Sequence, residues 1–191
     1  YTADAITVTT PYLRKVLTRY NKNIHVLPNY LDETIWHFRE PLQTPAENLP
    51  LTIMYMGTQT HKEDAVEIVE VLKTVLERYG AKINLKFYGM DPPESLLGLS
   101  NVSSLPFGPY EFVDFAQGLV ELSADIGIAP LADHPFNRSK SGIKYFEYTA
   151  MGIPGIYSAL EPYTETIKPG QTGFLAHSSM EWLEYLTAVI E

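Results

Sequence analysis

Two lysines and a glutamate lie close together in the chain, at spacings that could serve ligand binding. Lys140, Lys144 and Glu147 follow one another at intervals of four and three residues, which predicts one shared helical face. Ammonium groups beside a helix N-terminus bind phosphate oxygens, and a carboxylate accepts hydrogen bonds from the vicinal hydroxyls of a ribose. The pattern indicates a site for a phosphorylated, hydroxyl-rich ligand such as a nucleotide sugar.

The same residues also have an explanation that needs no ligand. Lys144 and Glu147 can form an ion pair three residues apart on a surface helix, where such a pair contributes about 0.2–0.5 kcal/mol. The spacing alone favours this ion pair, so the ligand site has to be supported by other parts of the chain.

A second pair of basic residues stands at another predicted helix start. His61 and Lys62 fall in its first turn, where the helix dipole normally favours acidic side chains. A bound anion would explain them, although Glu63 and Asp64 could neutralise the same turn. We favour the anion because both basic clusters follow strands of one predicted sheet.

An aromatic segment offers a place for a nucleotide base. Phe107, Tyr110 and Phe112 follow a short predicted strand, and an aromatic ring with free backbone groups can hold a base. Packing of these rings into the core beside a turn remains the alternative.

Other catalytic classes are not indicated. The five histidines show no metal-ligand spacing, and the chain has no cysteine. Neither a P-loop, a Gly-x-Ser-x-Gly elbow nor a Gly-x-Gly-x-x-Gly loop is present. We therefore expect no bound metal and no hydrolase triad.

Composition describes an ordinary globular chain that is acidic overall. The 191 residues carry a net charge of −9, which argues against a nucleic-acid partner. No apolar run approaches the roughly 18 residues of a membrane span, and no signal peptide is visible. Because the sequence begins at Tyr1 rather than Met and ends in a stretch that is predicted to be helical, we expect a fragment of a longer polypeptide.

Strands and helices are predicted to alternate along the chain. Apolar or β-branched runs predict strands at 6–9, 24–27, 51–56, 85–88, 102–105, 126–129, 155–157 and 173–176. The alternation predicts an α/β fold with a Rossmann-like parallel sheet flanked by helices. Ligands of such sheets bind beyond the carboxyl ends of the strands, where the loops 57–62, 105–110 and 130–142 are expected.

Local signals mark the ends of several helices. Thr60 and Glu63 predict a capping box for one continuous helix that ends at Tyr79 before Gly80. Its expected core stripe comprises Val66, Val69, Leu72, Val75 and Leu76. Ser178 and Glu181 predict a second capping box, and Gly152 is expected to end the helix that carries Glu147.

Four segments, taken in order, resemble the C-terminal, donor-binding half of GT-B glycosyltransferases of the large retaining "group 1" family. They are Val26 to Asp32, Tyr55 to Gly57 with Thr60 to Asp64, Phe146 to Tyr148 with Ala150 to Pro154, and Pro169 to Leu175. The resemblance covers nearly the whole chain, and the ordered set is specific. It implies that residues 1–27 are either the end of a missing N-terminal acceptor domain or a hinge βαβ piece, and that residues 28–191 form the donor-binding domain.

The resemblance also implies roles for individual residues. Glu147 would hold the donor ribose, and Lys62 would be the main lysine at the diphosphate, joined by Gly57, His61, Lys140 and Lys144. Ser139, Ser141 and Gly142 would contact phosphate or donor sugar, while Leu105 and Tyr110 would frame the base. The donor would be a UDP-, GDP- or ADP-linked sugar, bound without a cofactor or metal ion.

Two positions depart from the family pattern. Ser139 stands where these enzymes often have the first of two glutamates, and Thr58 stands where an arginine often follows the glycine. These differences concern recognition of the donor sugar more than nucleotide binding, and Lys140 and Lys144 could take over part of the missing contacts.

The implied activity is sugar transfer from the nucleotide to a glycan or lipid-linked acceptor. The catalytic groups would come from the missing acceptor domain, so this fragment alone would not turn over. The implied location is cytoplasmic, with contact at the inner membrane surface as one option. Alternatives are a non-catalytic GT-B-derived module for glycan binding or assembly, and a GT-B sugar epimerase. A phosphorylase would need a pyridoxal-binding lysine helix, which is not visible.

Overall fold

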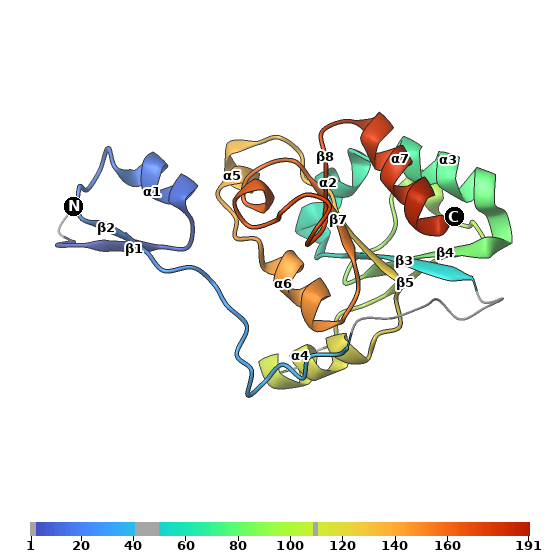
Figure 1. The fold of residues 1–191 in the computed structure, drawn as a ribbon, viewed down its shortest axis with the longest axis horizontal. Coiled ribbons are helices and arrows are strands. Elements are labelled where there is room, and N and C mark those ends of the chain that lie inside the picture. Colours follow the sequence, from blue (N-terminus) through green and yellow to red (C-terminus); the bar gives the residue numbers. More distant parts are fainter. Residues whose placement is uncertain (1–2, 41–49, 109–110) are drawn as a thin grey trace.

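Six parallel strands form the central sheet of the structure, a computed structural model that describes residues 3–40, 50–108 and 111–191. The strand order is β5-β4-β3-β6-β7-β8 (Figure 1). The bounds are Leu51–Met56 for β3, Ile83–Tyr88 for β4, Val102–Leu105 for β5, Ile126–Ala129 for β6, Gly155–Ser158 for β7 and Phe174–Ala176 for β8. The predicted Rossmann-like parallel sheet is confirmed.

The chain order of the strands reverses at the centre of the sheet. β3 pairs with β4 on one side and with β6 on the other, and its register places Ile53 opposite Ile126. The connections that leave β3 and β6 therefore diverge, and they open a crevice at the carboxyl ends of these two strands. Both predicted basic clusters belong to these connections.

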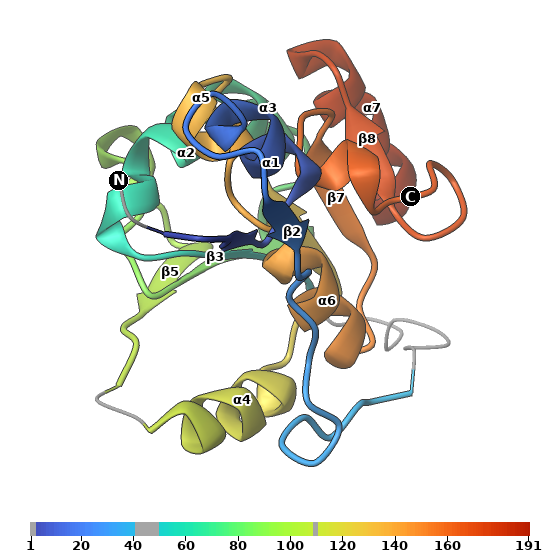
Figure 2. The ribbon, with the colours of Figure 1, turned by 90° about the vertical axis from the view of Figure 1, so that its left-hand side faces the viewer.

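Helices cover both faces of the sheet, as Figure 2 shows. One face packs against α2 (Lys62–Val66), α3 (Val69–Tyr79) and α7 (Ser179–Ile190), and the other against α4 (Phe112–Glu121) and α6 (Ile143–Ala150). Successive residues of β3 point to opposite faces of the sheet, so Ile53 packs in the core under α2, α3 and α7, and Met54 packs in the core under α4 and α6.

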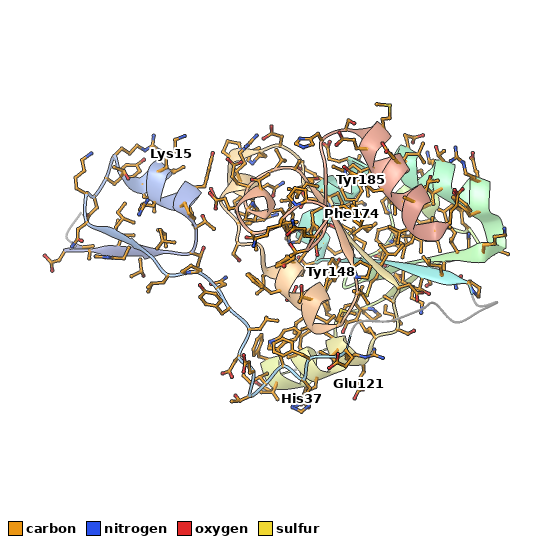
Figure 3. The ribbon with its side chains drawn as sticks, in the orientation of Figure 1. Lys15, His37, Glu121, Tyr148, Phe174 and Tyr185 are labelled. Atoms are coloured by element: carbon orange, nitrogen blue, oxygen red, sulfur yellow. The ribbon has the colours of Figure 1, made fainter. Side chains whose placement is uncertain are left out.

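The helix that carries Glu147 is held tightly against β6. Tyr148 of α6, labelled in Figure 3, is fully buried. Its hydroxyl donates a hydrogen bond of 2.9 Å to the carbonyl of Ile128. A Cβ atom on Gly127 would lie 2.5 Å from the Tyr148 ring, so glycine leaves the room that the ring needs. This packing fixes the position of α6 relative to the crevice.

The N-terminal residues form a small unit of their own. β1 (Ile6–Val8) and β2 (Ile24–Val26) pair in parallel as a separate two-stranded sheet, joined by α1 (Pro11–Leu17), which contains no buried residue. Figure 1 shows this unit beside the main domain. The division of the chain at residue 27 into an acceptor-domain end and a donor domain stays a prediction.

The segment that follows β2, residues 31–40, packs against the main domain beside α4 and α6. The side chain of Trp36 is 1% exposed and belongs to the core beneath α4 and α6. The backbone N–H of Arg39 donates to the carbonyl of Ala150 at 2.9 Å, and its guanidinium donates to the carbonyl of Val120 at 3.0 Å. These contacts anchor residues 31–40 to the domain that contains the central sheet.

The predicted continuous helix over 60–79 is wrong in two respects. A short 3₁₀ turn (Gln59–His61) leads into α2, and the chain bends before α3 begins at Val69. The hydroxyl of Thr60 pairs with that of Thr58 at 2.7 Å, so the expected capping box does not form. Because of the bend, Ile68 enters the core, whereas Val66 is 52% exposed.

The other helix ends follow their predicted signals more closely. Gly80 directly follows α3 with a φ of 53°, and Gly152 follows the C-cap residue Met151 of α6 with a φ of 72°. At α7 the hydroxyl of Ser178 accepts the N–H of Glu181 at 3.3 Å. The Glu181 carboxylate accepts the N–H of His177 at 2.6 Å, one residue before the position that a capping box uses.

Candidate functional site

A pocket of about 260 Å³ lies at the carboxyl ends of β3 and β6. Four residues predicted for the site line it, namely His61, Lys140, Ser141 and Lys144, together with Leu131, Ile143 and Tyr163. His61 of the first basic cluster thus meets Lys140 and Lys144 of the second, about 80 residues further along the chain. Residues so far apart can line one pocket because the loops that follow β3 and β6 diverge at the centre of the parallel sheet.

Lys144 is the most unusual residue of the pocket. It stands in the first turn of α6, and 8% of its surface is exposed. Within the described part of the chain its Nζ has no hydrogen-bond partner, and it lies 5.0 Å from the centre of the Tyr55 ring. Burial lowers the pKa of Lys144 to about 8. The alternative of an exposed Lys144–Glu147 surface pair therefore does not describe this side chain.

Asp64 connects the two loops that form the pocket. One carboxylate oxygen accepts hydrogen bonds from the side chain of Asn137 at 2.6 Å and from the N–H of Ala132 at 3.1 Å. The other oxygen lies 3.0 Å from Nδ1 of His61 and 3.3 Å from Nζ of Lys140. A residue of α2 thereby fixes the connection that follows β6.

The same contacts keep Asp64 charged although it is 3% exposed. Burial by itself raises the pKa of a carboxyl group, but hydrogen bonds from His61 and Ala132 and the charge of Lys140 lower the pKa of Asp64 to about 2. From the sequence, Asp64 was expected only to neutralise the first turn of its helix, not to belong to the site. The sequence signal that could have placed Asp64 in the site is its position three residues after His61, which puts the two side chains within reach of each other.

Glu147 lies one turn beyond Lys144 on α6. It is partly buried, and burial raises the pKa of its carboxyl to about 7 against the opposing charge of Lys144. Glu147 does not line the pocket itself, so its part in ligand binding stays a prediction. Its carboxyl group titrates near neutral pH, close to the pKa of Lys144.

The loop before α6 places its residues in different ways. Ser139 donates its hydroxyl to the carbonyl of Pro135 at 2.7 Å, whereas the hydroxyl of Ser141 accepts from the side chain of Asn29 at 2.9 Å. Gly142 is buried immediately before the helix. Lys140 also precedes α6, so the prediction of one helical face for Lys140, Lys144 and Glu147 is wrong; the turn brings Lys140 to the pocket.

The remaining predicted residues lie elsewhere or close by. Lys62 is exposed and lines a different surface hollow beside Glu94. Leu105 ends β5 with 47% of its surface exposed, and its carbonyl accepts the N–H of Gly89. Tyr110 falls outside the described residues. Gly57 adjoins the pocket, since an added Cβ would lie 3.2 Å from Cβ of His61. The roles of these residues stay predictions.

Two negative findings concern residues 3–40, 50–108 and 111–191. Among them, no three histidine, aspartate or glutamate side chains gather in a way that could hold a metal ion. In the same residues, no helix combines the length and the hydrophobicity of a membrane span.

This chain resembles known proteins in its three-dimensional structure but not detectably in its sequence. No family model matches the sequence, and no curated protein matches it significantly. The structure of Anabaena HepE in complex with UDP-glucose superposes with a TM-score of 0.69 over 99% of this chain at 15% identity. TarM gives a TM-score of 0.68 over 97% at 12% identity, and the lipopolysaccharide outer core galactosyltransferase WaaB gives 0.63 over 97% at 16% identity.

The chain has the GT-B fold. Solved structures at such low identity establish this fold, and they confirm the fold that the sequence motifs predicted. The chain spans 54% of HepE, 52% of WaaB and 36% of TarM. It therefore corresponds to one part of these GT-B proteins.

Proposed function

We propose that this GT-B domain binds the nucleotide diphosphate of a sugar donor in the pocket between β3 and β6. The observation that carries the proposal is the ammonium group of Lys144, which is buried without a hydrogen-bond partner in the described residues. A buried charged group whose hydrogen bonds are unmade costs several kcal/mol. A phosphate oxygen entering the pocket would supply the missing partner and offset that cost.

The surroundings of Lys144 suit a diphosphate. Lys140 and His61 line the same pocket from two different loops, and the pocket adjoins the N-terminus of α6, whose dipole favours anions. Basic groups and a helix dipole can stabilise the leaving diphosphate without a metal ion. In the proposal Glu147 holds the ribose, and the loop after Leu105 frames the base.

The structural neighbours support a nucleotide sugar as the ligand. HepE was solved with UDP-glucose, and the pneumococcal O-GlcNAc transferase GtfA was solved with UDP and GlcNAc. For this chain we propose a UDP-, GDP- or ADP-linked donor. We further propose that the sugar is transferred with retention of configuration to a glycan or lipid-linked acceptor in the cytoplasm. The acceptor-binding half would be supplied by residues outside these 191. The chain alone would then bind nucleotide without turnover.

Isothermal titration calorimetry with UDP, GDP and ADP tests the proposal directly. We expect one of the three to bind, and Lys144→Met to weaken that binding about 10- to 100-fold, as expected for the loss of a hydrogen bond to a charged group. Lys73→Met is the matched control, because Lys73 pairs with Glu70 on α3 and lies outside the pocket. Absence of binding by all three nucleotides, or full affinity in Lys144→Met, would contradict the proposal.

A second pair of variants separates the two candidate diphosphate lysines. The family resemblance favours Lys62, whereas the structure places Lys140 in the pocket and Lys62 outside it. We expect Lys140→Met to reduce nucleotide affinity more than Lys62→Met. The opposite order would return the diphosphate role to Lys62.

A non-catalytic glycan-binding or assembly module is the second candidate. It is favoured by Ser139, which replaces a glutamate of the family pattern and donates its hydroxyl back to Pro135. This candidate predicts a domain that binds no nucleoside diphosphate, so the same calorimetric titrations distinguish the two functions.

A further inference from the structure

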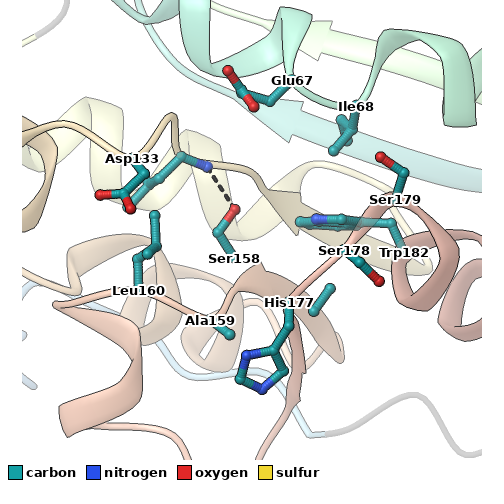
Figure 4. A pocket seen from close by; sticks show the side chains of 12 residues that line it. Glu67, Ile68, Asp133, Ser158, Ala159, Leu160, His177, Ser178, Ser179 and Trp182 are labelled. Carbon is teal, nitrogen blue, oxygen red and sulfur yellow. Dashed lines mark hydrogen bonds between the residues drawn. The ribbon is translucent and has the colours of Figure 1, made fainter.

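A second pocket lies at the carboxyl ends of β6, β7 and β8, on the side of the sheet that α2 and α7 cover. Its volume is about 420 Å³, within the range of about 300–1,000 Å³ that is typical of small-molecule sites. Figure 4 shows it from close by. Leu131 lines both this pocket and the one with Lys144, so the two are neighbours with different walls.

Two buried side chains line this second pocket, and within the described residues neither the indole N–H of Trp182 nor the hydroxyl proton of Ser158 is donated. The side chain of Trp182 is 4% exposed, and its ring reaches from α7 toward Ser158 (Figure 4). Its Nε1 donates to no residue in the described part of the chain, yet it is not sealed from solvent as the Nε1 of Trp36 is. Since Trp182 lines the pocket, a ligand oxygen there can accept this hydrogen bond.

Ser158 provides the second donor. Its side chain is 8% exposed, and its oxygen accepts the backbone N–H of Leu131 at 2.8 Å, as the dashed line in Figure 4 marks. Accepting that bond leaves the hydroxyl proton available. No acceptor for this proton exists among the described residues. Two donors that are more than nine-tenths buried thus line one wall.

The rim of the pocket carries acceptors instead. Glu67 and Asp133 contribute carboxylates, and Asp133 is held by two hydrogen bonds from Arg138, at 2.6 and 2.8 Å. Of the described residues that line the pocket, none is a lysine or arginine. The Arg138 guanidinium offsets the charge of Asp133, and His177 adds an imidazole to the lining, so among the described lining residues Glu67 is the unpaired carboxylate that disfavours phosphate and other anions.

From this arrangement we infer a binding site for a neutral saccharide unit, separate from the nucleotide pocket. A sugar hydroxyl is both donor and acceptor, so it can accept from Trp182 and Ser158 while its neighbours donate to Glu67 and Asp133. Apolar atoms of Leu160 and the indole ring can pack on the C–H face of the sugar. The inference stands on this pocket alone and does not require the proposed nucleotide function.

NMR of the ¹⁵N-labelled chain tests the site. The chain contains two tryptophans, so its spectrum has two indole N–H signals, and replacing either tryptophan by Phe assigns the other. The probes are methyl α-D-glucopyranoside, methyl α-D-galactopyranoside and N-acetyl-D-glucosamine in the millimolar range, with sodium phosphate as the anionic comparison. We expect a neutral saccharide to shift the Trp182 signal saturably, while the Trp36 signal stays in place and phosphate has no effect.

Variants then link the shift to the named groups. Ser158→Ala should weaken saccharide binding about fivefold to tenfold, the value of one hydrogen bond, whereas Ser103→Ala on exposed β5 should not. Lys144→Met should keep full saccharide affinity. If the spectrum shows that Ser158→Ala is unfolded, Glu67→Gln, which changes an exposed side chain, replaces it with the same expected weakening.

Three results would overturn the inference. The first is that no neutral saccharide moves the Trp182 signal. The second is a larger shift with phosphate than with any saccharide. The third is unchanged saccharide affinity in a folded Ser158→Ala or Glu67→Gln variant.

Discussion

The ammonium group of Lys140 lies 3.3 Å from the Oδ2 atom of Asp64, across the crevice between β3 and β6. The two residues are 76 positions apart in the sequence, and each follows a different strand. With the hydrogen bonds from Asn137 and Ala132, this contact fixes the two loops that form the pocket. The negative charge of Asp64 also keeps a cation next to Lys144.

The charge of Asp64 should make stability depend on acid pH. Its folded pKa of about 2 lies below the ordinary value of 3.8, so its contribution is complete above about pH 4 and is lost as the pH falls toward 2. A shift of this size corresponds to about 2 kcal/mol. We expect Asp64→Asn to lose about that much unfolding free energy at pH 7 and little at pH 2, measured by urea denaturation, with exposed Glu77→Gln unchanged. Equal losses at both pH values would contradict the electrostatic origin.

Lys144→Met should stabilise the ligand-free chain. Because burial lowers the pKa of Lys144 from 10.5 to about 8, its charge opposes folding below pH 8, and the opposition fades as the pH rises toward 10.5. We expect a gain of about 1–3 kcal/mol at pH 7 that shrinks by pH 9.5, seen in denaturant unfolding. Lys73→Met, at an exposed pair, should change stability by no more than about 0.5 kcal/mol. A destabilised Lys144→Met protein would show that Lys144 has a structural partner.

Nucleotide affinity should pass through a maximum between about pH 7 and pH 8. Burial raises the pKa of Glu147 to about 7 and lowers that of Lys144 to about 8, so both groups are charged chiefly between these values. Calorimetry from pH 5.5 to 9.5, with whichever of UDP, GDP and ADP binds, measures the profile. Part of the affinity loss at acid pH comes from protonation of the nucleotide phosphate itself. Glu147→Gln should remove the rest of the acid-side loss and leave the alkaline loss intact. A profile that Glu147→Gln does not alter would remove Glu147 from the ligand site.

The contact between Gly127 and Tyr148 should tolerate no added methyl group. A Cβ at residue 127 would lie 2.5 Å from the buried ring, and the strain should cost about 1–3 kcal/mol. Gly118→Ala on α4 is the matched control, because nothing lies within 4 Å of its Cβ position and alanine favours a helix by about 0.5–1 kcal/mol. Thermal unfolding should therefore show opposite signs for the two variants. A neutral Gly127→Ala would mean that α6 can move away from β6.

The N-terminal unit should open far more readily than the central sheet. A two-stranded sheet is marginally stable by itself, and α1 buries no residue against it. Hydrogen exchange followed by mass spectrometry should show rapid exchange over residues 6–26 and strong protection over β3 and β6. Comparable protection of both regions would argue against a domain division near residue 27.

Much of the fold could be predicted from local sequence signals. The apolar run of β3 and the small-residue start of α6 were sufficient to place these elements, because hydrophobic periodicity and capping act over a few neighbouring residues. The predicted helix over 60–79 failed where a bend put Ile68 rather than Val66 into the core. Such a bend depends on the packing of α2 against the rest of the sheet, which no local pattern contains.

The candidate site divides in the same way. The parallel α/β architecture and the loops with basic residues could be predicted locally, since both follow from the order and type of neighbouring side chains. The burial of Lys144, the approach of Lys140 to the same pocket from a turn, and the position of Lys62 in another hollow became clear only from the assembled fold. The link that Asp64 makes between the two pocket loops is likewise visible only in the assembled fold. Whether a charge is buried, and what compensates it, depends on segments that are distant in the sequence and meet only when the sheet is assembled.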